Sequence, residues 1–191
     1  AGEATLQLLK KLAKSVTLLN NCCCGLPAYS YGDMDAAKKL AAKNLAILAS
    51  DEFDVIVTDC SSCASFLKKY PEIFADDSRR QQAEEIAVRF KDMVELIVPN
   101  EPVSVSPENP LVATYHDPCH ASRGQGLATE PREILKNIEG IEYREMPEAD
   151  WCCGGAGSYA LSHYDLSQKV LDRKMENLKK TGADLLVTSC P

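Results

Sequence analysis

Cysteine is the residue type in this sequence whose number and spacing point to chemistry. The 191 residues contain nine cysteines, and most of them stand in runs or pairs. They are Cys22, Cys23, Cys24, Cys60, Cys63, Cys119, Cys152, Cys153 and Cys190. Clustered thiolates bind zinc and iron–sulfur clusters. Metal ligation is therefore the first hypothesis for these residues.

Disulfide bonds explain the cysteines less well. Disulfide scaffolds are usually short and secreted, with an even number of cysteines, whereas this count is odd and the first residues do not resemble a signal peptide. Cys152 and Cys153 cannot bridge each other without strain, because a disulfide prefers Cα atoms about 5.5 Å apart. Scattered buried thiols would explain one or two cysteines, but not runs. The pattern favours metal ligands in a reducing, cytoplasmic compartment.

Composition excludes several classes of protein. Hydrophobic residues make up 45% and charged residues 26% of the chain, as in soluble globular proteins. A net charge of -7 argues against a nucleic-acid partner, which would be held by phosphate contacts. No apolar run approaches the roughly 18 residues of a transmembrane segment. No serine–histidine–acid or paired-carboxylate pattern identifies catalytic residues, which stay unknown at this point.

Helical and strand patterns alternate along the chain and would position the cysteines. Amphipathic spacing and strong helix formers predict helices over 5–14, 33–49, 62–70, 80–97, 131–138 and 165–181, with Asp33 as an N-cap. Short apolar or β-branched runs predict strands over 16–19, 53–58, 111–115, 141–144 and 184–188. This alternation predicts an α/β fold with short parallel sheets flanked by helices.

A proline-rich segment divides the chain. Four of the ten prolines fall within residues 99–110. Proline removes backbone donors and favours extended conformations, so this segment is interpreted as a linker or a crossing strand. The predicted domains are therefore residues 1–98 and 111–191.

The two halves repeat each other. Residues 23–25 match residues 152–154 as Cys-Cys-Gly at an offset of 129. Residues 54–60 (DVIVTDC) match residues 184–190 (DLLVTSC) at an offset of 130. The gap from the double cysteine to the later one is 35 residues in the first half and 36 in the second. The sequence therefore predicts a duplication, with halves related by a pseudo-two-fold axis.

The predicted strands bring the cysteines of each half together. In each half the double cysteine follows one strand, and the later cysteine follows the next. Ligands of open parallel sheets gather outside the carboxyl ends of the strands. The first predicted site contains Cys23, Cys24, Cys60 and Cys63, and the second contains Cys119, Cys152, Cys153 and Cys190. Four thiolates suit either zinc or an iron–sulfur cluster.

The spacing resembles the CCG or cysteine-rich domain, in which a single cysteine precedes Cys-Cys-Gly and Cys-x-x-Cys follows after a further gap. In the second half, 32 residues separate Cys119 from the double cysteine at 152–153, and 36 residues separate that pair from Cys190. The first half supplies Cys-Cys-Gly at 23–25 and Cys-x-x-Cys at 60–63. The resemblance covers essentially the whole chain.

Residues 115–120 (YHDPCH), 123–126 (RGQG) and 148–158 (EADWCCGGAGS) are similar to the iron–sulfur subunit of glycolate and lactate oxidases. That resemblance implies [4Fe-4S] clusters, non-cubane in some relatives, in an electron-transfer subunit of an oxidoreductase. It also implies a flavin-containing dehydrogenase partner and other redox subunits, with any peripheral membrane association made through them. The related B subunit of heterodisulfide reductase suggests an alternative, direct reduction of a disulfide, and a structural zinc module is a third reading.

Each half departs from the family pattern by one cysteine. The first-half counterpart of Cys119 falls about ten residues before Ala1, and the second-half counterpart of Cys63 falls two residues after Pro191. A fragment of a longer protein is therefore expected. In such a fragment we expect more metal in the first half, which retains its Cys-x-x-Cys pair, or none in either.

Three further residues near the predicted sites are weaker candidates for metal ligands. The counterpart of Cys22 is Trp151, so Cys22 is expected to be a packing residue. His116 and His120 flank Cys119 and are weaker candidate ligands, because histidine replaces cysteine in some clusters.

Overall fold

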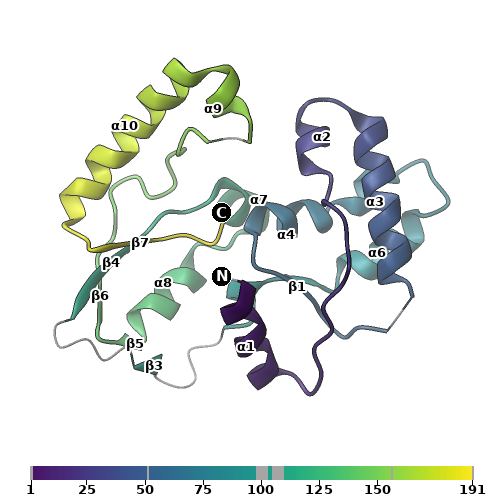
Figure 1. Ribbon diagram of the computed structural model, residues 1–191, viewed down its shortest axis with the longest axis horizontal. Helices are drawn as coiled ribbons and strands as arrows, with labels where there is room; N and C mark the ends of the chain where they lie inside the picture. The colour runs from purple at the N-terminus through teal and green to yellow at the C-terminus, as the bar shows by residue number, and fades with distance from the viewer. Residues whose placement is uncertain (1, 51, 98–102, 105–109, 156, 191) are drawn as a thin grey trace. The chain divides into compact units, whose positions relative to one another are not determined.

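The computed structural model describes residues 2–50, 52–97, 103–104, 110–155 and 157–190. The chain divides into two compact units, residues 1–93 and 94–191 (Figure 1). Helices flank short sheets, and every strand pair is parallel, so the predicted α/β class is confirmed. The pseudo-two-fold relation and the predicted repeat boundaries stay predictions.

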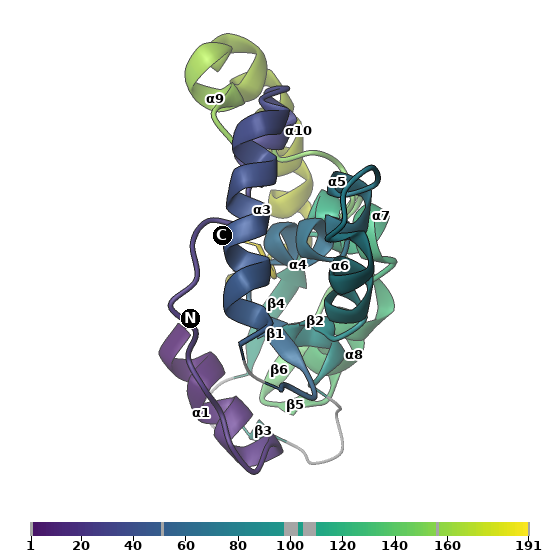
Figure 2. The ribbon, with the colours of Figure 1, turned by 90° about the vertical axis from the view of Figure 1, so that its right-hand side faces the viewer.

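The first unit packs helices around a two-stranded sheet. Its elements are α1 (Gly2–Leu12), α2 (Leu26–Ser30), α3 (Met34–Leu48), β1 (Ile56–Thr58), α4 (Ser61–Leu67), α5 (Tyr70–Ile73), α6 (Arg80–Ala87) and β2 (Phe90–Asp92). Strands β1 and β2 pair in parallel, with Ile56 opposite Phe90. Figure 2 shows α3 beside α5 and α6, with α4 next to the strands. Asp33 caps α3 as predicted, because its carboxylate accepts a hydrogen bond from the Ala36 N–H at 2.9 Å.

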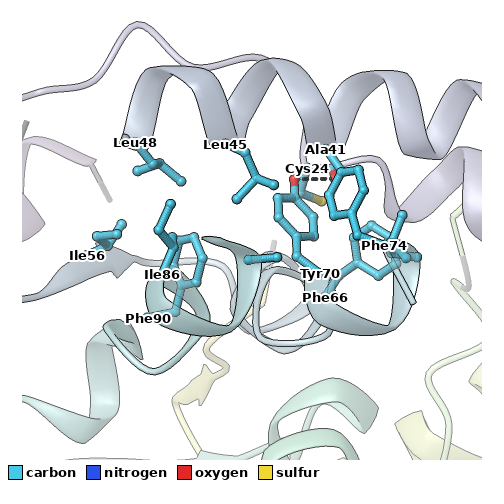
Figure 3. Packing of buried hydrophobic residues seen from close by; sticks show 12 residues of the cluster. Cys24, Ala41, Leu45, Leu48, Ile56, Phe66, Tyr70, Phe74, Ile86 and Phe90 are labelled. Carbon is cyan, nitrogen blue, oxygen red and sulfur yellow. Dashed lines mark hydrogen bonds between the residues drawn. The ribbon is translucent and has the colours of Figure 1, made fainter. Parts of the chain in front are cut away.

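Tyr70 lies at the centre of the first unit's core. Figure 3 shows the buried side chains of α3, including Leu45, facing an aromatic group from α4, α5 and β2. The Tyr70 ring is fully buried and makes edge contacts with Phe66, Phe74 and Phe90. Such edge-to-face arrangements are favoured by the ring quadrupoles. The core therefore fixes the position of the tyrosine hydroxyl group.

The described part of the second unit contains a three-stranded parallel sheet, one long helix, α10, and three shorter ones. Its elements after a short 3-10 turn (Met93–Glu95) are β3 (Val103–Ser104), β4 (Leu111–Tyr115), α7 (Cys119–Gln125), α8 (Thr129–Lys136), β5 (Ile138–Glu139), β6 (Ile141–Tyr143), α9 (Tyr159–Ser162), α10 (Tyr164–Thr181) and β7 (Leu185–Val187). The sheet order is β6-β4-β7, and β3 pairs separately with β5. The central strand β4 buries Ala113, Thr114 and Tyr115.

A partly buried ionic network ties the strand ends of the second unit to α8. Arg132 of α8 donates to both carboxylate oxygens of Asp117, at 2.8 and 2.7 Å. It also donates to both oxygens of Glu145, which follows β6. Tyr143 completes the network by donating to Glu145 at 2.6 Å. Because Asp117 stands two residues before Cys119, the network also fixes the approach to that cysteine.

Four predicted elements differ from the structure. Residues 16–19 form no strand, because no described strand lies beside them to complete a ladder. The strand predicted over 53–58 is limited to β1, the part that pairs with β2. The helix predicted over 62–70 ends at Leu67, and a new helix starts at Tyr70 with Pro71 in its first turn, where a missing N–H costs nothing.

The fourth difference is the helix predicted over 80–97. It ends at Ala87, and β2 follows because Phe90 pairs with β1. The helix predicted over 131–138 is α8, and Ile138 begins β5. Of the proline-rich segment, residues 99–102 and 105–109 lie outside the described residues. The helices of the described part of the chain include none that is long and apolar enough to span a membrane.

The first unit's core predicts a large effect of removing Leu45, which is 1% exposed. Leu45→Ala should lower the free energy of unfolding by about 2 to 5 kcal/mol, because the change leaves a cavity that the packed aromatics cannot fill. Urea titration followed by circular dichroism measures this. Leu18→Ala is the matched control, since Leu18 is 75% exposed and should cost less than about 0.5 kcal/mol. Equal effects of the two changes would contradict this description of the core.

The ionic network predicts that Arg132→Met destabilises the second unit by about 3 kcal/mol. The change leaves the Asp117 carboxylate, whose side chain is 5% exposed, without its counter-ion. Arg80→Met removes an exposed pair with Glu84 and should cost less than about 0.5 kcal/mol. Urea unfolding of both variants measures the contrast. A cost for Arg132→Met as small as that for Arg80→Met would show that the network adds nothing to stability.

Candidate metal centres

Two buried polar side chains hold the run of three cysteines in the first unit. Asn44 of α3 accepts a hydrogen bond from the Cys22 N–H at 3.1 Å and donates to the Cys23 carbonyl at 3.1 Å. The Tyr70 hydroxyl donates to the Cys24 carbonyl at 2.7 Å and accepts from Asn44 at 3.0 Å, and Figure 3 shows the bond to Cys24. Each cysteine thus has a backbone group bound to a side chain that is itself fixed by the core.

The glycine of each Cys-Cys-Gly turn lies against the backbone of the second helix after it, α3 or α10. Gly25 has φ +100°, and a Cβ there would lie 3.2 Å from the Ala37 carbonyl oxygen. Gly154 has φ +83°, and a Cβ there would lie 2.6 Å from the Ser167 carbonyl oxygen. Ala37 and Ser167 are each the fourth residue of their helix, α3 and α10. Only glycine allows both the left-handed backbone and this close approach.

The second pair of cysteines in the first unit follows the carboxyl end of β1. Cys60 is the N-cap residue of α4, and its N–H donates to the Thr58 hydroxyl at 3.3 Å. Cys63 lies in the first turn of the same helix. Cys24 is buried, Cys60 and Cys63 are half-buried, and Cys23 is exposed. The site therefore reaches from the core to the surface of the unit.

The four thiols of the first predicted site interact directly. A hydrogen bond with Cys63 is the main reason that the pKa of Cys24 is lowered to about 7, although burial opposes the shift. The pKa of Cys63 is raised, because it is hydrogen-bonded to Cys24 and Cys60 and is half-buried. Cys23 also hydrogen-bonds to Cys24 and lowers its pKa. Cys24 therefore lies within hydrogen-bonding reach of Cys63 and Cys23, and Cys60 lies close to both Cys24 and Cys63, while the four-residue site itself stays a prediction.

In the second unit, α10 holds the loop that precedes the double cysteine. Lys174 donates to the carbonyls of Glu148 and Ala149, both at 2.9 Å. The Glu148 carboxylate accepts hydrogen bonds from Arg173 and Asn177, which stabilise its unusual φ of +53°. The Ser167 hydroxyl donates to the Gly154 carbonyl at 2.9 Å on the far side of the cysteines. The double cysteine therefore lies between two fixed points on one helix.

Three cysteines and one histidine interact in the second predicted site. A hydrogen bond with His116 is the main influence lowering the pKa of Cys153, against burial. The pKa of Cys119, the first residue of α7, is raised by partial desolvation of its thiol and by the nearby Cys152 and Cys153. The His116 ring also contacts the Ala149 carbonyl through Nδ1 at 3.2 Å. Cys119 and Cys152 are exposed and Cys153 is half-buried.

Cys190 follows β7 at the same edge of the sheet as Cys119 follows β4. It is half-buried, and the preceding Ser189 hydroxyl lies 2.9 Å from the hydroxyl of Tyr115 at the end of β4. Its contribution to the second site stays a prediction.

Cys22 differs from the predicted ligands, because its thiol is turned inward toward the Asn44 carbonyl oxygen at 3.3 Å and the Leu40 carbonyl oxygen at 3.6 Å.

Sequence reasoning missed the residues that hold the cysteines. Asn44, Tyr70 and Lys174 are polar positions within helices, and no periodicity distinguishes them from ordinary surface positions. Their near-complete burial is evident only in the folded chain. For Asn44 and Lys174 alone, one signal was present in the sequence, because the 130-residue offset between them equals the offset of the repeat.

The donor chemistry of both sites fits an iron–sulfur cluster. All nine cysteines are free, and each predicted site offers thiols on rigid backbone turns. Within the described ranges, no three histidine, cysteine or acidic side chains are already arranged as a metal-binding set. The Cys63 thiol hydrogen-bonds to Cys24, which lowers the pKa of Cys24 and raises that of Cys63, and metal ligation requires both thiols to be deprotonated. An all-sulfur set of this kind suits an iron–sulfur cluster or zinc.

Comparison with known proteins identifies relatives over the whole chain. A probable glycolate oxidase iron-sulfur subunit from Bacillus subtilis (strain 168) is 34% identical over 194 residues, covering 100% of this chain and 44% of that protein. Lactate utilization protein A from Macrococcus caseolyticus is 36% identical and covers 97% of this chain and 76% of the relative. The protein of the same name from Bacillus thuringiensis is 33% identical, with 97% and 78% coverage.

The chain thus spans less than half of the Bacillus subtilis relative and about three quarters of the other two. The pattern of the family described as Cysteine-rich domain (CCG) matches residues 1–68 and 113–191. These two matches contain both Cys-Cys-Gly turns and all nine cysteines. The chain belongs to the cysteine-rich (CCG) domain family.

Proposed function

We propose that this chain is an iron–sulfur electron-transfer component of a system that oxidises lactate or glycolate. The observation that carries the proposal is the duplicated Cys-Cys-Gly turn, which in each unit lies against a helix that holds it through a buried polar side chain. Cys60, Cys119 and Cys190 follow the carboxyl ends of strands β1, β4 and β7. The names of the relatives, a glycolate oxidase iron-sulfur subunit and lactate utilization proteins, supply the substrate class. The ligands would be Cys23, Cys24, Cys60 and Cys63 in the first unit and Cys119, Cys152, Cys153 and Cys190 in the second.

The chain's own residues would hold the clusters and leave a surface for electron exchange. A bound iron–sulfur cluster would accept and release single electrons without making or breaking a bond to substrate. Asn44 and Tyr70 keep the first cysteine run in one conformation, which limits reorganisation when the charge changes. Exposed Cys119 and Cys152 would place part of the second cluster near the surface, where a redox partner can approach.

The oxidation of the 2-hydroxy acid is assigned to a partner. This step removes two electrons and two protons from the substrate, and a flavin accepts them as a pair. A flavin-containing dehydrogenase subunit would carry out that step and pass the electrons singly to this chain. Other redox subunits would take them onward, and any membrane contact would be peripheral and made through these partners. The free thiols suit the reducing cytoplasm.

Anaerobic purification followed by iron, sulfide and zinc analysis tests the proposed cofactor. Iron and sulfide in equal amounts, absorbance near 400 nm and an EPR signal after reduction are expected. Zinc without sulfide would overturn the proposal in favour of a structural zinc module. Cluster reduction on adding lactate or glycolate with the flavin-containing subunit would support the redox role, whereas direct reduction of a disulfide substrate would favour the heterodisulfide-type alternative.

The proposed ligands predict that Cys152→Ser and Cys153→Ser each abolish cluster binding in the second unit. A serine hydroxyl is a far poorer ligand for iron than a thiolate, while the change in side-chain volume is small. Iron content and the EPR signal measure the loss, and circular dichroism should show retained helices. Cys22→Ser is the matched control, because the Cys22 thiol points inward to Asn44, and it should keep the full iron content. Unchanged iron in both Cys152 and Cys153 variants would remove these residues from the site.

The two units also predict unequal retention of metal in the isolated chain. The first unit supplies Cys60 and Cys63 from one helix start, which favours chelation, whereas the second supplies Cys190 alone at that position. Cys152→Ser leaves only the first site intact, and Cys24→Ser leaves only the second. When iron is limiting, the Cys152→Ser chain should therefore keep more iron than the Cys24→Ser chain. Metal analysis after gel filtration measures this. More iron in the Cys24→Ser chain would show that Cys119 matters more than the Cys-x-x-Cys pair.

A further inference from the structure

A buried lysine lies behind the cysteine loop of the second unit. Lys174 of α10 is 3% exposed, and its ammonium group donates to the carbonyls of Glu148 and Ala149. These two residues stand three and four positions before the double cysteine, and a negative charge on Cys153 would favour the charged form of Lys174. Burying a charged lysine costs free energy, so Lys174 differs from the exposed lysines of the same helix.

Lys174 is not the counter-ion of the neighbouring carboxylates, because each of them forms an ion pair with an arginine. Asp117 is paired with Arg132, Glu148 with Arg173, and Asp150 with Arg123. Burial lowers the pKa of Lys174, while Asp150, Asp117, Cys153 and Glu148 each favour its charged form. The ammonium group is therefore a fixed positive charge facing the loop.

The first unit has a neutral group at the same place. Asn44 is the eleventh residue of α3, and Lys174 is the eleventh residue of α10. Both are buried, both follow the glycine-contacting fourth residue of the helix by seven positions, and both donate to carbonyls of the segment carrying the double cysteine. Asn44 is held by Cys22, Cys23 and Tyr70 and brings no charge. The two halves of the repeat thus differ by one full positive charge at these matched positions.

We propose that Lys174 raises the reduction potential of the cluster at the second site, so that the two sites of the repeat are electronically inequivalent. A reduced cluster carries one more negative charge than the oxidised form, and a nearby buried cation stabilises the more negative state. Asn44 gives the first site no such stabilisation. Electrons would therefore favour the second site, where the exposed Cys119 and Cys152 face solvent. This inference rests on the proposed iron–sulfur function.

Redox titration of three variants tests the role of the charge. Lys174→Gln keeps a side-chain donor but removes the charge, Lys174→Arg keeps the charge, and Lys179→Gln removes an exposed charge from the same helix as a matched control. The full chain is titrated anaerobically with dithionite, which supplies the electron that each cluster accepts. EPR follows each site, and the signal missing from Cys152→Ser identifies the second one.

The expected result is a shift of the second-site potential to a more negative value in Lys174→Gln, with the first-site potential unchanged. Lys174→Arg and Lys179→Gln should titrate like the unaltered chain. An unshifted second-site potential in a fully loaded Lys174→Gln chain would overturn the inference alone. Loss of the second cluster from Lys174→Gln would also overturn it, because it would assign Lys174 to holding the loop. Absence of iron from the unaltered chain would overturn the proposed function, and this inference with it.

Discussion

The close approach of each Cys-Cys-Gly turn to the second helix after it, α3 or α10, is the constraint on which both sites depend. At Gly25 and Gly154 the chain adopts a positive φ and passes so near the helix backbone that no side chain fits. Both contacts fall on the fourth residue of the helix, Ala37 or Ser167. The preceding cysteines are therefore set at a fixed distance from a rigid element, as a ligand site requires.

Hydrogen bonds to buried side chains complete this arrangement, and the two units use different ones. In the first unit, Asn44 and Tyr70 bind the backbone of the cysteine run itself. In the second, Lys174 binds the loop before the cysteines, and Ser167 binds the glycine after them. Backbone groups near a site must find partners, and these side chains supply them at positions that only the interior can fix. The same architecture thus acquires a neutral support in one half and a charged support in the other.

The thiols explain why such rigid support is needed. Four cysteines held together repel one another as thiolates, so without metal they share protons, as Cys24 and Cys63 do. A metal centre reverses this balance, because its positive charge compensates the thiolates. The aromatic core around Tyr70 in the first unit and the Asp117–Arg132–Glu145 network in the second provide the necessary stiffness.

The sequence by itself determined the α/β class and showed the internal repeat, because these follow from local patterns and from spacing along the chain; the grouping of the cysteines into two sites stays a prediction from that spacing. Helices such as α3 and α10 were predictable for the same reason. Only the tertiary structure decided that residues 16–19 form no strand and that Phe90 begins one, since strands depend on pairing with distant partners. It also decided which polar helix residues turn inward. Asn44 and Lys174 are buried because they meet backbone carbonyls far away in the sequence, and no local pattern encodes that encounter.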